Sequence, residues 1–500
     1  MRTLSEPTEA HAAAGAADAH LALRNGLKLA ASLVFTWGIA LAIRLVLPRR
    51  LGPLRFGALN FADAFTATAF VALSLGLDTY VRREIAVRPA HASDFFGGLV
   101  ALRLALTALV IAGIAVFLGV TGRDAEVRHV VYVYAVAQLF IAWNSTFSAM
   151  LQARGRVDGM SVLAVATKVI WAGGVLVAMA VGAGLWAYAA AVLASESVET
   201  VVLYAFARRH VGLTFRFDAG ATRQVVVASV PFFVATGAQL VYGRLGVTFL
   251  ELRADSREVG WNGAASALAG IALMGAPILV GVVTPMLARA AARSTDELFQ
   301  LMRRIVEYVV VTVSPLALLL YLGADVWVKL VFGPAYAPAA STVRVMAPAF
   351  IVTCVAMINS TVLILRGNAW TVTAASVGGV FLNALLNFSF IGHLDPLLRG
   401  DGAAGASSAL AMFVTELALF AVQSVALQGE AFDRRALRRL VITALACAAV
   451  VALDVALRPL GPLRLVADAG AYLVLSVAGG ALDVREIVGF ARSALKARAG

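Results

Sequence analysis

The sequence has few charged residues, and it lacks loops long enough to hold a soluble domain. Charged residues make up 14% of the 500 positions and hydrophobic residues 61%, whereas a soluble domain has about 25% charged residues. Fourteen apolar stretches fill most of the chain. Each approaches the roughly 20 residues that a helix needs to cross the hydrocarbon layer, and a helix satisfies its own backbone polar groups in lipid. The sequence therefore predicts an all-α polytopic membrane protein.

The spacing of these stretches divides the chain into two groups of six spans and a last pair. The predicted spans are residues 26–47, 58–81, 95–120, 130–151, 160–181, 185–207, 225–250, 259–287, 305–322, 339–365, 370–391, 403–427, 440–457 and 465–482. The corresponding domains are a cytosolic tail at 1–24, an N-terminal lobe at 25–207, a cytoplasmic linker at 208–224, a C-terminal lobe at 225–427, the last two helices at 437–482 and a cytosolic tail at 483–500.

Cysteine is nearly absent, and so are the motifs of covalent chemistry. Cys354 and Cys447 fall in separate predicted helices without CxxC spacing, which predicts small core residues and not a disulfide. The sequence shows no Gly-rich phosphate loop, metal-ligand cluster or nucleophile elbow. The longest predicted outer loop, 324–338, has only Asp325 and Lys329 as charges. We therefore expect neither an enzyme active site nor a bound cofactor.

Basic residues concentrate in alternate loops, among them Arg82-Arg83, Arg208-Arg209 and Arg434-Arg435. Because cytoplasmic loops carry the excess of Lys and Arg, this pattern places both termini in the cytoplasm. The net charge of +12 then reflects topology and attraction to anionic inner-leaflet lipid. We expect no nucleic-acid partner, since the chain has no soluble domain that could present a basic face.

A weak internal repeat accompanies the two groups of six spans. Asn144-Ser145-Thr146 precedes Arg154-Gly155, and Asn359-Ser360-Thr361 precedes Arg366-Gly367, at offsets of 215 and 212 positions. Gly57 and Gly260 lie 203 positions apart, each near the start of a predicted span. The nearly constant offset favours a duplicated unit of six helices. An even number of helices preserves orientation, so the two copies should be related by an axis along the membrane normal.

Three passages resemble polysaccharide flippases of the multidrug/oligosaccharidyl-lipid/polysaccharide exporter superfamily. They are Pro48–Gly57 before the second span, Leu330–Tyr336 before the tenth, and Asn383 with Leu386-Asn387 followed by Gly402–Ala406. The resemblance extends over residues 25–482, and the number of spans agrees with it. It implies two six-helix, MATE-like lobes around a central cavity, with two further helices at the C-terminus.

By the same resemblance, the protein would translocate lipid-linked (polyprenyl-pyrophosphate) oligosaccharide across the cytoplasmic membrane by alternating access, for polysaccharide or O-antigen synthesis. A proton or sodium gradient would drive it. The expected partners are the lipid-linked oligosaccharide, membrane lipids and polysaccharide assembly proteins. A lipid II flippase has the same number of helices and stays an alternative, as does a cation-coupled multidrug exporter, although twelve helices are usual there. A glycan polymerase or ligase would need a large catalytic outer loop.

Polar residues within spans are the candidates for substrate binding. Arg44, Asp63 and Arg244 fall in helices that line the cavity of the resembled fold, and a guanidinium meets phosphate oxygens in pairs. Pairing between Asp63 and Arg44 is the structural alternative. Gln239, Tyr242 and Asn262 lie in the seventh and eighth spans, and amide side chains both donate to and accept from sugar hydroxyls.

Carboxylates within spans are the candidates for ion coupling. Glu196 and Glu199 are three positions apart and share one helix face. Two such groups in a low dielectric favour binding of a proton. The alternative is a packing network with neighbouring Ser and Thr residues. Glu416 lies near the middle of the twelfth span and is either an ion site or part of an interhelical hydrogen bond.

Overall fold

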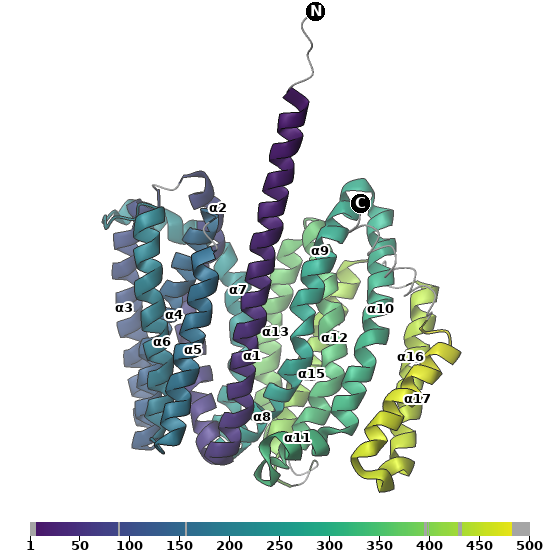
Figure 1. Ribbon diagram of the computed structural model, residues 1–500. Coiled ribbons are helices and arrows are strands. Elements are labelled where there is room, and N and C mark those ends of the chain that lie inside the picture. Colours follow the sequence, from purple (N-terminus) through teal and green to yellow (C-terminus); the bar gives the residue numbers. More distant parts are fainter. Residues whose placement is uncertain are drawn as a thin grey trace, which may run out of the picture. The chain divides into compact units, whose positions relative to one another are not determined.

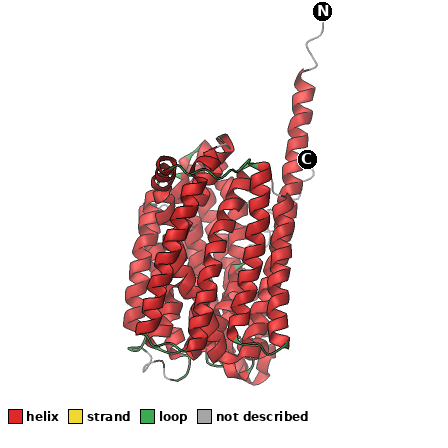
Figure 2. Cartoon of the chain, turned by 90° about the vertical axis from the view of Figure 1, so that its left-hand side faces the viewer, coloured by secondary structure: helices red, strands yellow, loops and turns green. Residues whose placement is uncertain are grey.

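The computed structural model describes residues 7–88, 91–155, 158–394, 398, 400–428 and 433–482. All regular elements in this part of the chain are helices, as Figure 2 shows, which confirms the predicted all-α class. Residues 483–500 of the predicted C-terminal tail and the first six residues lie outside the described part.

The chain forms two compact units that share two helices. Unit 1 comprises Met1–Arg44 and Ala62–Gly237, and unit 2 comprises Leu45–Phe61 and Ala238–Gly500. Helices α1 (Pro7–Ala69) and α7 (Ala219–Arg253) therefore each run from one unit into the other. Gly52 interrupts α1 with a non-helical backbone (φ 74°, ψ 167°), which divides it into two helical runs.

The helices of unit 1 pack side by side, as Figure 1 shows. Besides its parts of α1 and α7, it contains η1 (Phe70–Ser74), α2 (Leu77–Val87), α3 (His91–Val120), α4 (Ala125–Ala153), α5 (Asp158–Ala180) and α6 (Leu185–His210). Aromatic rings fill its core near the start of α3. The Phe96 ring packs edge-on against Trp143, with centroids 5.7 Å apart, and also contacts Phe147 and Tyr204. Such rings bury large apolar areas, so they hold α3, α4 and α6 together.

Unit 2 contains the remaining helices. They are α8 (Ser256–Leu273), α9 (Gly275–Arg293), α10 (Thr295–Leu322), α11 (Ala324–Phe332), η2 (Pro334–Tyr336), α12 (Ala339–Leu365), α13 (Ala369–Phe390), α15 (Ala403–Ala426), α16 (Arg434–Leu457), η3 (Arg458–Leu463) and α17 (Arg464–Ala478). Tyr336 is buried in η2, and its hydroxyl donates to the carbonyl of Pro48 at 2.8 Å. Burial raises the pKa of this phenol, so it stays protonated and able to donate.

Ten described helices are long and apolar enough to cross a membrane, or eleven if the bent halves of α7 count as one span. Two of the ten, Phe35–Ser74 and Arg434–Ala478, each contain a glycine with a non-helical backbone, Gly52 and Gly461. Each of these two segments therefore holds two helical runs, as predicted. The predicted eighth span corresponds to α8 and α9, which meet at Met274.

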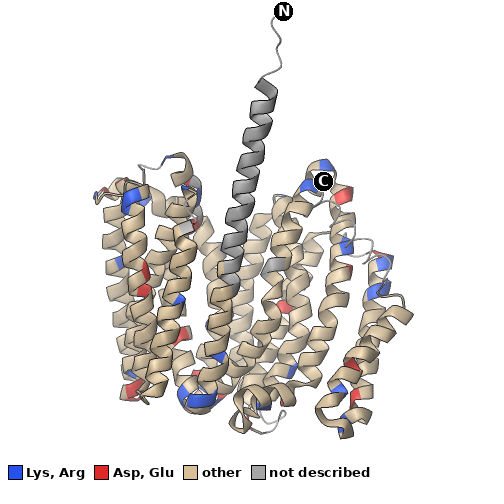
Figure 3. Ribbon diagram, in the orientation of Figure 1, with Lys and Arg blue, Asp and Glu red and all other residues tan. Residues whose placement is uncertain are grey.

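Charge and exposure follow the pattern expected in lipid. Figure 3 shows most Lys and Arg near the ends of the helices. Large apolar side chains point outward along the helices, for example Leu109 and Val116 of α3, which are 69% and 67% exposed. On a soluble monomer, an exposed apolar surface of this extent would promote aggregation. In a membrane, the hydrocarbon of the lipid tails solvates it.

Two helix backbones touch in unit 2, at the glycines that the repeat singles out. A Cβ on Gly57 of α1 would lie 1.6 Å from the carbonyl oxygen of Ser256, and a Cβ on Gly260 of α8 would lie 2.0 Å from that of Pro53. Ser256 follows Pro53 by 203 positions, and Gly260 follows Gly57 by the same number. The contact is therefore reciprocal, which is the pattern of two equivalent segments about a local twofold axis.

The second repeated motif also has equivalent local structure. After Asn144 and Asn359, α4 and α12 have Arg154 and Arg366 as their C-cap residues, each followed by a glycine with positive φ. Gly155 donates to the carbonyl of Gln152 at 2.9 Å, and Gly367 donates to that of Ile364 at 3.0 Å. Glycine adopts this left-handed conformation without the steric cost of a Cβ. The duplication predicted from sequence thus recurs in the helix ends.

We predict that Gly260→Ala destabilises the protein, because its Cβ has no room beside the Pro53 backbone. Overpacking of this kind costs about 1–3 kcal/mol. Gly270→Ala is the matched control in the same helix, since nothing lies within 4 Å of its built Cβ. Thermal unfolding of the purified variants measures the difference, and equal melting temperatures for the two would contradict the close contact.

Candidate substrate and coupling sites

A buried arginine holds the break that separates η1 from α2 in unit 1. Leu75 and Gly76 adopt left-handed conformations there, with φ of 49° and 63°. Arg103 of α3 is fully buried, and its Nε donates to the carbonyl of Leu73 at 3.1 Å. Its Nη2 donates to the Thr146 hydroxyl at 2.9 Å. A carbonyl released from the helix ladder needs such a donor inside lipid, so Arg103 stabilises the break.

Further contacts show why this position favours arginine. The guanidinium carbon of Arg103 lies 4.5 Å from the centre of the Trp143 ring, in a cation–π contact. The charge of Asp78, in the first turn of α2, also acts on Arg103, and the Ser145 hydroxyl donates to Asp78. Lysine could supply the charge but not the planar, forked set of donors. The sequence shows Arg103 as a cation inside the predicted span 95–120, but its partners become visible only in the structure.

Glu196 is part of a hydrogen-bonded network between α4 and α6. Asn144 Nδ2 donates to a Glu196 carboxylate oxygen at 2.9 Å and to the Glu196 carbonyl at 3.1 Å. The Thr200 hydroxyl donates to Asn144 Oδ1 at 2.5 Å. Both polar ends of Asn144 are thus used in packing. This arrangement supports the packing alternative for Glu196, while an ion-coupling role stays a prediction.

Glu199 faces α5, away from the Asn144 network. One of its carboxylate oxygens accepts from the Thr167 hydroxyl at 3.1 Å. The charges of Glu196 and Lys168 both act on it. Glu199 thus has one hydroxyl donor and charges of both signs nearby, and it stays a candidate for ion coupling.

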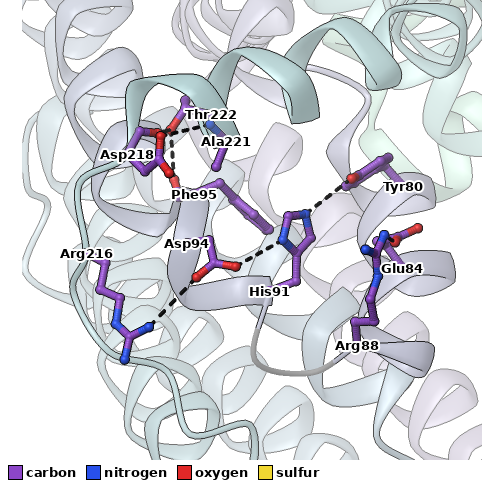
Figure 4. Close-up of polar contacts among 10 residues, drawn as sticks. All are labelled: Tyr80, Glu84, Arg88, His91, Asp94, Phe95, Arg216, Asp218, Ala221 and Thr222. Carbon is purple, nitrogen blue, oxygen red and sulfur yellow. Dashed lines mark hydrogen bonds and ion pairs between the residues drawn. The ribbon is translucent and has the colours of Figure 1, made fainter.

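A polar cluster joins α2, α3 and the segment before α7 at one end of unit 1. Figure 4 shows His91 between two partners, with Nδ1 3.2 Å from an Asp94 carboxylate oxygen and Nε2 3.5 Å from the Tyr80 hydroxyl. Asp94 also lies 3.9 Å from Arg216. The backbone of Gly97 donates to the Arg216 carbonyl at 2.8 Å. The predicted linker, 208–224, is thereby bound to the start of α3.

In unit 2, a residue predicted to bind substrate forms a hydrogen bond with a residue predicted to bind ions. The Tyr242 hydroxyl of α7 donates to a Glu416 carboxylate oxygen of α15 at 2.9 Å. Glu416 is 7% exposed. A neutral donor lowers the cost of burying a carboxylate. Tyr242 was predicted for substrate and Glu416 for ions, and the structure brings them into one hydrogen-bonded pair.

An acidic side chain from α8 caps α15. The two carboxylate oxygens of Glu258 accept from the backbone N–H groups of Gly402 and Gly405, at 2.8 and 2.9 Å. The first N–H groups of a helix have no partner within it, and its dipole favours a negative charge there. The Gly402–Ala406 passage thus lies where α8 meets α15. Sequence spacing did not reveal Glu258, because its partners are distant in the chain.

The other predicted site residues lie in both units. In unit 1, Arg44 is exposed and Asp63 is half-buried; in unit 2, Gln239 is exposed, Arg244 is half-buried and Asn262 is buried. The Asn262 side chain lies against the start of α15, near Gly405. The structure therefore places Gln239, Tyr242, Arg244 and Asn262 in unit 2, on α7 and α8. The substrate role of all six residues stays a prediction.

Comparisons with known proteins agree with this architecture. A family model described as polysaccharide biosynthesis protein matches residues 22–291. The structure of lipid II flippase MurJ in an inward closed conformation is similar, with a TM-score of 0.71 at 11% identity, over 92% of this chain and 99% of that one. No curated protein sequence matches the chain.

Multidrug transporters have a similar fold over less of the chain. An inward-facing MATE family transporter of the MOP superfamily has a TM-score of 0.62 at 14% identity, over 79% of this chain and 94% of that one. The Vibrio cholerae MATE transporter VcmN in the bent form has a TM-score of 0.51 at 14% identity, over 81% and 98%. At these identities, the similarity establishes the fold and not the substrate.

We predict that Arg103→Met lowers the stability of the protein, because it leaves the Leu73 carbonyl without its donor in a buried site. An unsatisfied buried group of this kind costs about 1–3 kcal/mol. Arg103→Lys should fall between this variant and the wild type, and Arg209→Met, at an exposed position of α6, is the control. Denaturation of the detergent-solubilised variants measures the order, and an unchanged midpoint for Arg103→Met would rule out the stabilising role.

Proposed function

The chain belongs to the polysaccharide biosynthesis protein family, and we propose that it flips lipid-linked (polyprenyl-pyrophosphate) oligosaccharide across the cytoplasmic membrane. The observation that carries this proposal is the family match, which extends over unit 1 and into α9 of unit 2. An oligosaccharide can cross the hydrocarbon layer only where polar groups of a protein replace its hydrogen bonds to water. A flippase supplies such a polar path. We also propose that both termini lie in the cytoplasm, because Lys and Arg are concentrated in the loops on that side.

The residues proposed to contact the head group combine cation and amide chemistry. Arg244 would bind the pyrophosphate, since a guanidinium donates in parallel to two phosphate oxygens and keeps its charge at any physiological pH. Gln239 and Asn262 would bind sugar hydroxyls through amide groups that donate and accept. Arg44 and Asp63 of unit 1 are proposed as further contacts of the head group.

Transport without covalent chemistry is proposed for this chain. A glycan polymerase would need a large outer loop for catalysis. The longest predicted outer loop of this chain, 324–338, is short, and several of its side chains are packed against the protein. Val328, Phe332 and Tyr336 are buried, and Asp325 is paired with Arg344. The match to the lipid II flippase extends over more of the chain than the matches to multidrug transporters, which supports a fourteen-helix flippase.

An ion gradient is proposed as the driving force, with Glu416 and Glu199 as coupling candidates. Tyr242 links Glu416 directly to α7, the helix that also carries Arg244 and Gln239. Protonation of Glu416 would remove the charge that the Tyr242 hydroxyl stabilises. Ion binding at α15 and substrate binding at α7 would then be coupled through one hydrogen bond.

We predict that Arg244→Ala blocks transport in cells. Deletion of the gene should leave lipid-linked repeat units on the inner leaflet, where an impermeant periodate probe cannot reach them. Wild-type protein should restore their exposure, Arg244→Lys only in part, and Arg244→Ala not at all at equal protein level. Arg257→Ala, at an exposed position of α8, is the control. Full exposure with Arg244→Ala would remove Arg244 from the site. Repeat units that are already exposed in the deletion strain would contradict the flippase assignment.

A further inference from the structure

The last two helices of unit 2 enclose a group of charges that the proposed transport path does not use. Asp454 lies one turn before the end of α16, and Arg464 and Asp468 lie in the first turns of α17. Arg464 Nε is 2.9 Å from Asp454 Oδ1, and Arg464 Nη2 donates to the Leu322 carbonyl of α10 at 3.0 Å. One cation thus stands beside two carboxyl groups.

Asp468 is the unusual member of this group. It is 1% exposed, and among the described residues neither of its carboxylate oxygens has a hydrogen-bond donor. Two charged side chains lie near Asp468, those of Asp454 and Arg464. Asp454 also approaches it within hydrogen-bonding range. A buried carboxylate with no donor is costly, and two carboxylates that share one site cannot both ionise easily. A single proton between the two groups supplies the missing donor and makes the group of three neutral.

We propose that Asp454 and Asp468 form a proton-binding site, in which one carboxyl group donates its proton to the other carboxylate and Arg464 neutralises the remaining charge. The proton comes from the aqueous medium, since both residues lie within about one turn of a helix end. No covalent bond other than O–H forms or breaks. The inference is independent of the substrate and concerns helices outside the proposed path.

A metal cation fits this position less well than a proton does. Sodium needs several oxygen ligands, and the neighbouring side chains of Leu318, Leu322, Val450 and Leu465 form an apolar cluster. Within the described residues, no group of three or more His, Cys, Asp or Glu side chains could hold a metal ion. A proton needs only the two carboxyl oxygens.

The site would control how α17 packs. Tyr472, one turn further along α17, is fully buried, and its hydroxyl donates to the Val311 carbonyl of α10 at 2.8 Å. With its proton, the group formed by the two carboxyl groups and Arg464 is neutral, and α17 packs on α16 and α10. After loss of the proton, Arg464 balances only one of the two carboxylates, and repulsion between them in an apolar interface would push α17 away from α16. The other titratable or charged groups on these helices and on the adjoining η3 and α11 are Asp296, Glu297, Arg303, Arg304, Glu307, Tyr308, Tyr321, Asp325, Lys329, Arg434, Arg435, Arg438, Arg439, Cys447 and Arg458.

Infrared spectroscopy of the full chain in lipid nanodiscs tests the site directly. At mildly acidic pH, we expect the wild type to show a protonated-carboxyl stretching band that shifts in heavy water, and we expect Asp468→Asn to lack it. Asn has the shape of the neutral acid and can donate to Asp454, so this variant should fold. Asp454→Asn is the second variant and should also lose the band. Glu307→Gln is the matched control, because Glu307 is buried but paired with Arg439 at 2.8 Å, so it should keep the band.

Melting temperature against pH gives a second readout. The wild type should lose stability as the pH rises and the proton leaves, whereas Asp468→Asn should show a flatter profile. A carboxyl band that is unchanged in both Asn variants would overturn the proposal. So would a wild-type melting temperature that rises with sodium at fixed pH and does so only while Asp468 is present, because the site would then bind a metal cation.

Discussion

The contact between two helix backbones at Gly57 and Gly260 is the constraint on which unit 2 depends. It removes both side chains from the interface, so the start of the second span lies directly on α8. Close approach of this kind is how helices gain van der Waals contact in lipid, where the hydrophobic effect does not drive helices together. Because the contact is reciprocal at one offset in the chain, it also connects the internal repeat to the structure. The adjoining segments then follow: Trp261 donates to the Ala335 carbonyl at 2.9 Å, and Tyr336 to that of Pro48.

Buried polar groups provide the second level of organisation. Arg103 stabilises a break in the second span, Glu258 caps α15, and Glu307 pairs with Arg439 between α10 and α16. Each of these contacts supplies a partner to a group that water would otherwise solvate. The same rule explains why Asn144 recurs in the second half as Asn359, which donates to the Ser424 hydroxyl of α15 at 3.4 Å. Polar positions repeated in sequence thus join equivalent helix pairs, α4 with α6 and α12 with α15.

The helices could be predicted from sequence because hydropathy and span length are local properties. The repeat was visible for the same reason, since Gly57 and Gly260 are recognisable from their places in the two groups of spans. The contacts between residues that are distant in the chain could not be predicted in this way. Tyr242 and Glu416 were identified separately, by residue type and by the cost of an intramembrane charge, yet they are 174 positions apart. Arg103 was visible as an intramembrane cation, but its partner is a carbonyl freed by a helix break. Neither the break nor the partner has a sequence signature.

Movement of a lipid-linked oligosaccharide between leaflets is the central claim, and purified protein can test it. The measurement uses liposomes that carry a fluorescent lipid-linked oligosaccharide in both leaflets, with and without the protein, and an impermeant reductant added outside. Without protein, about half of the fluorescence should survive; with protein, nearly all should be lost as inner-leaflet molecules reach the outer face. Survival of half the signal in sealed vesicles that contain correctly folded protein, with and without an ion gradient, would contradict the account.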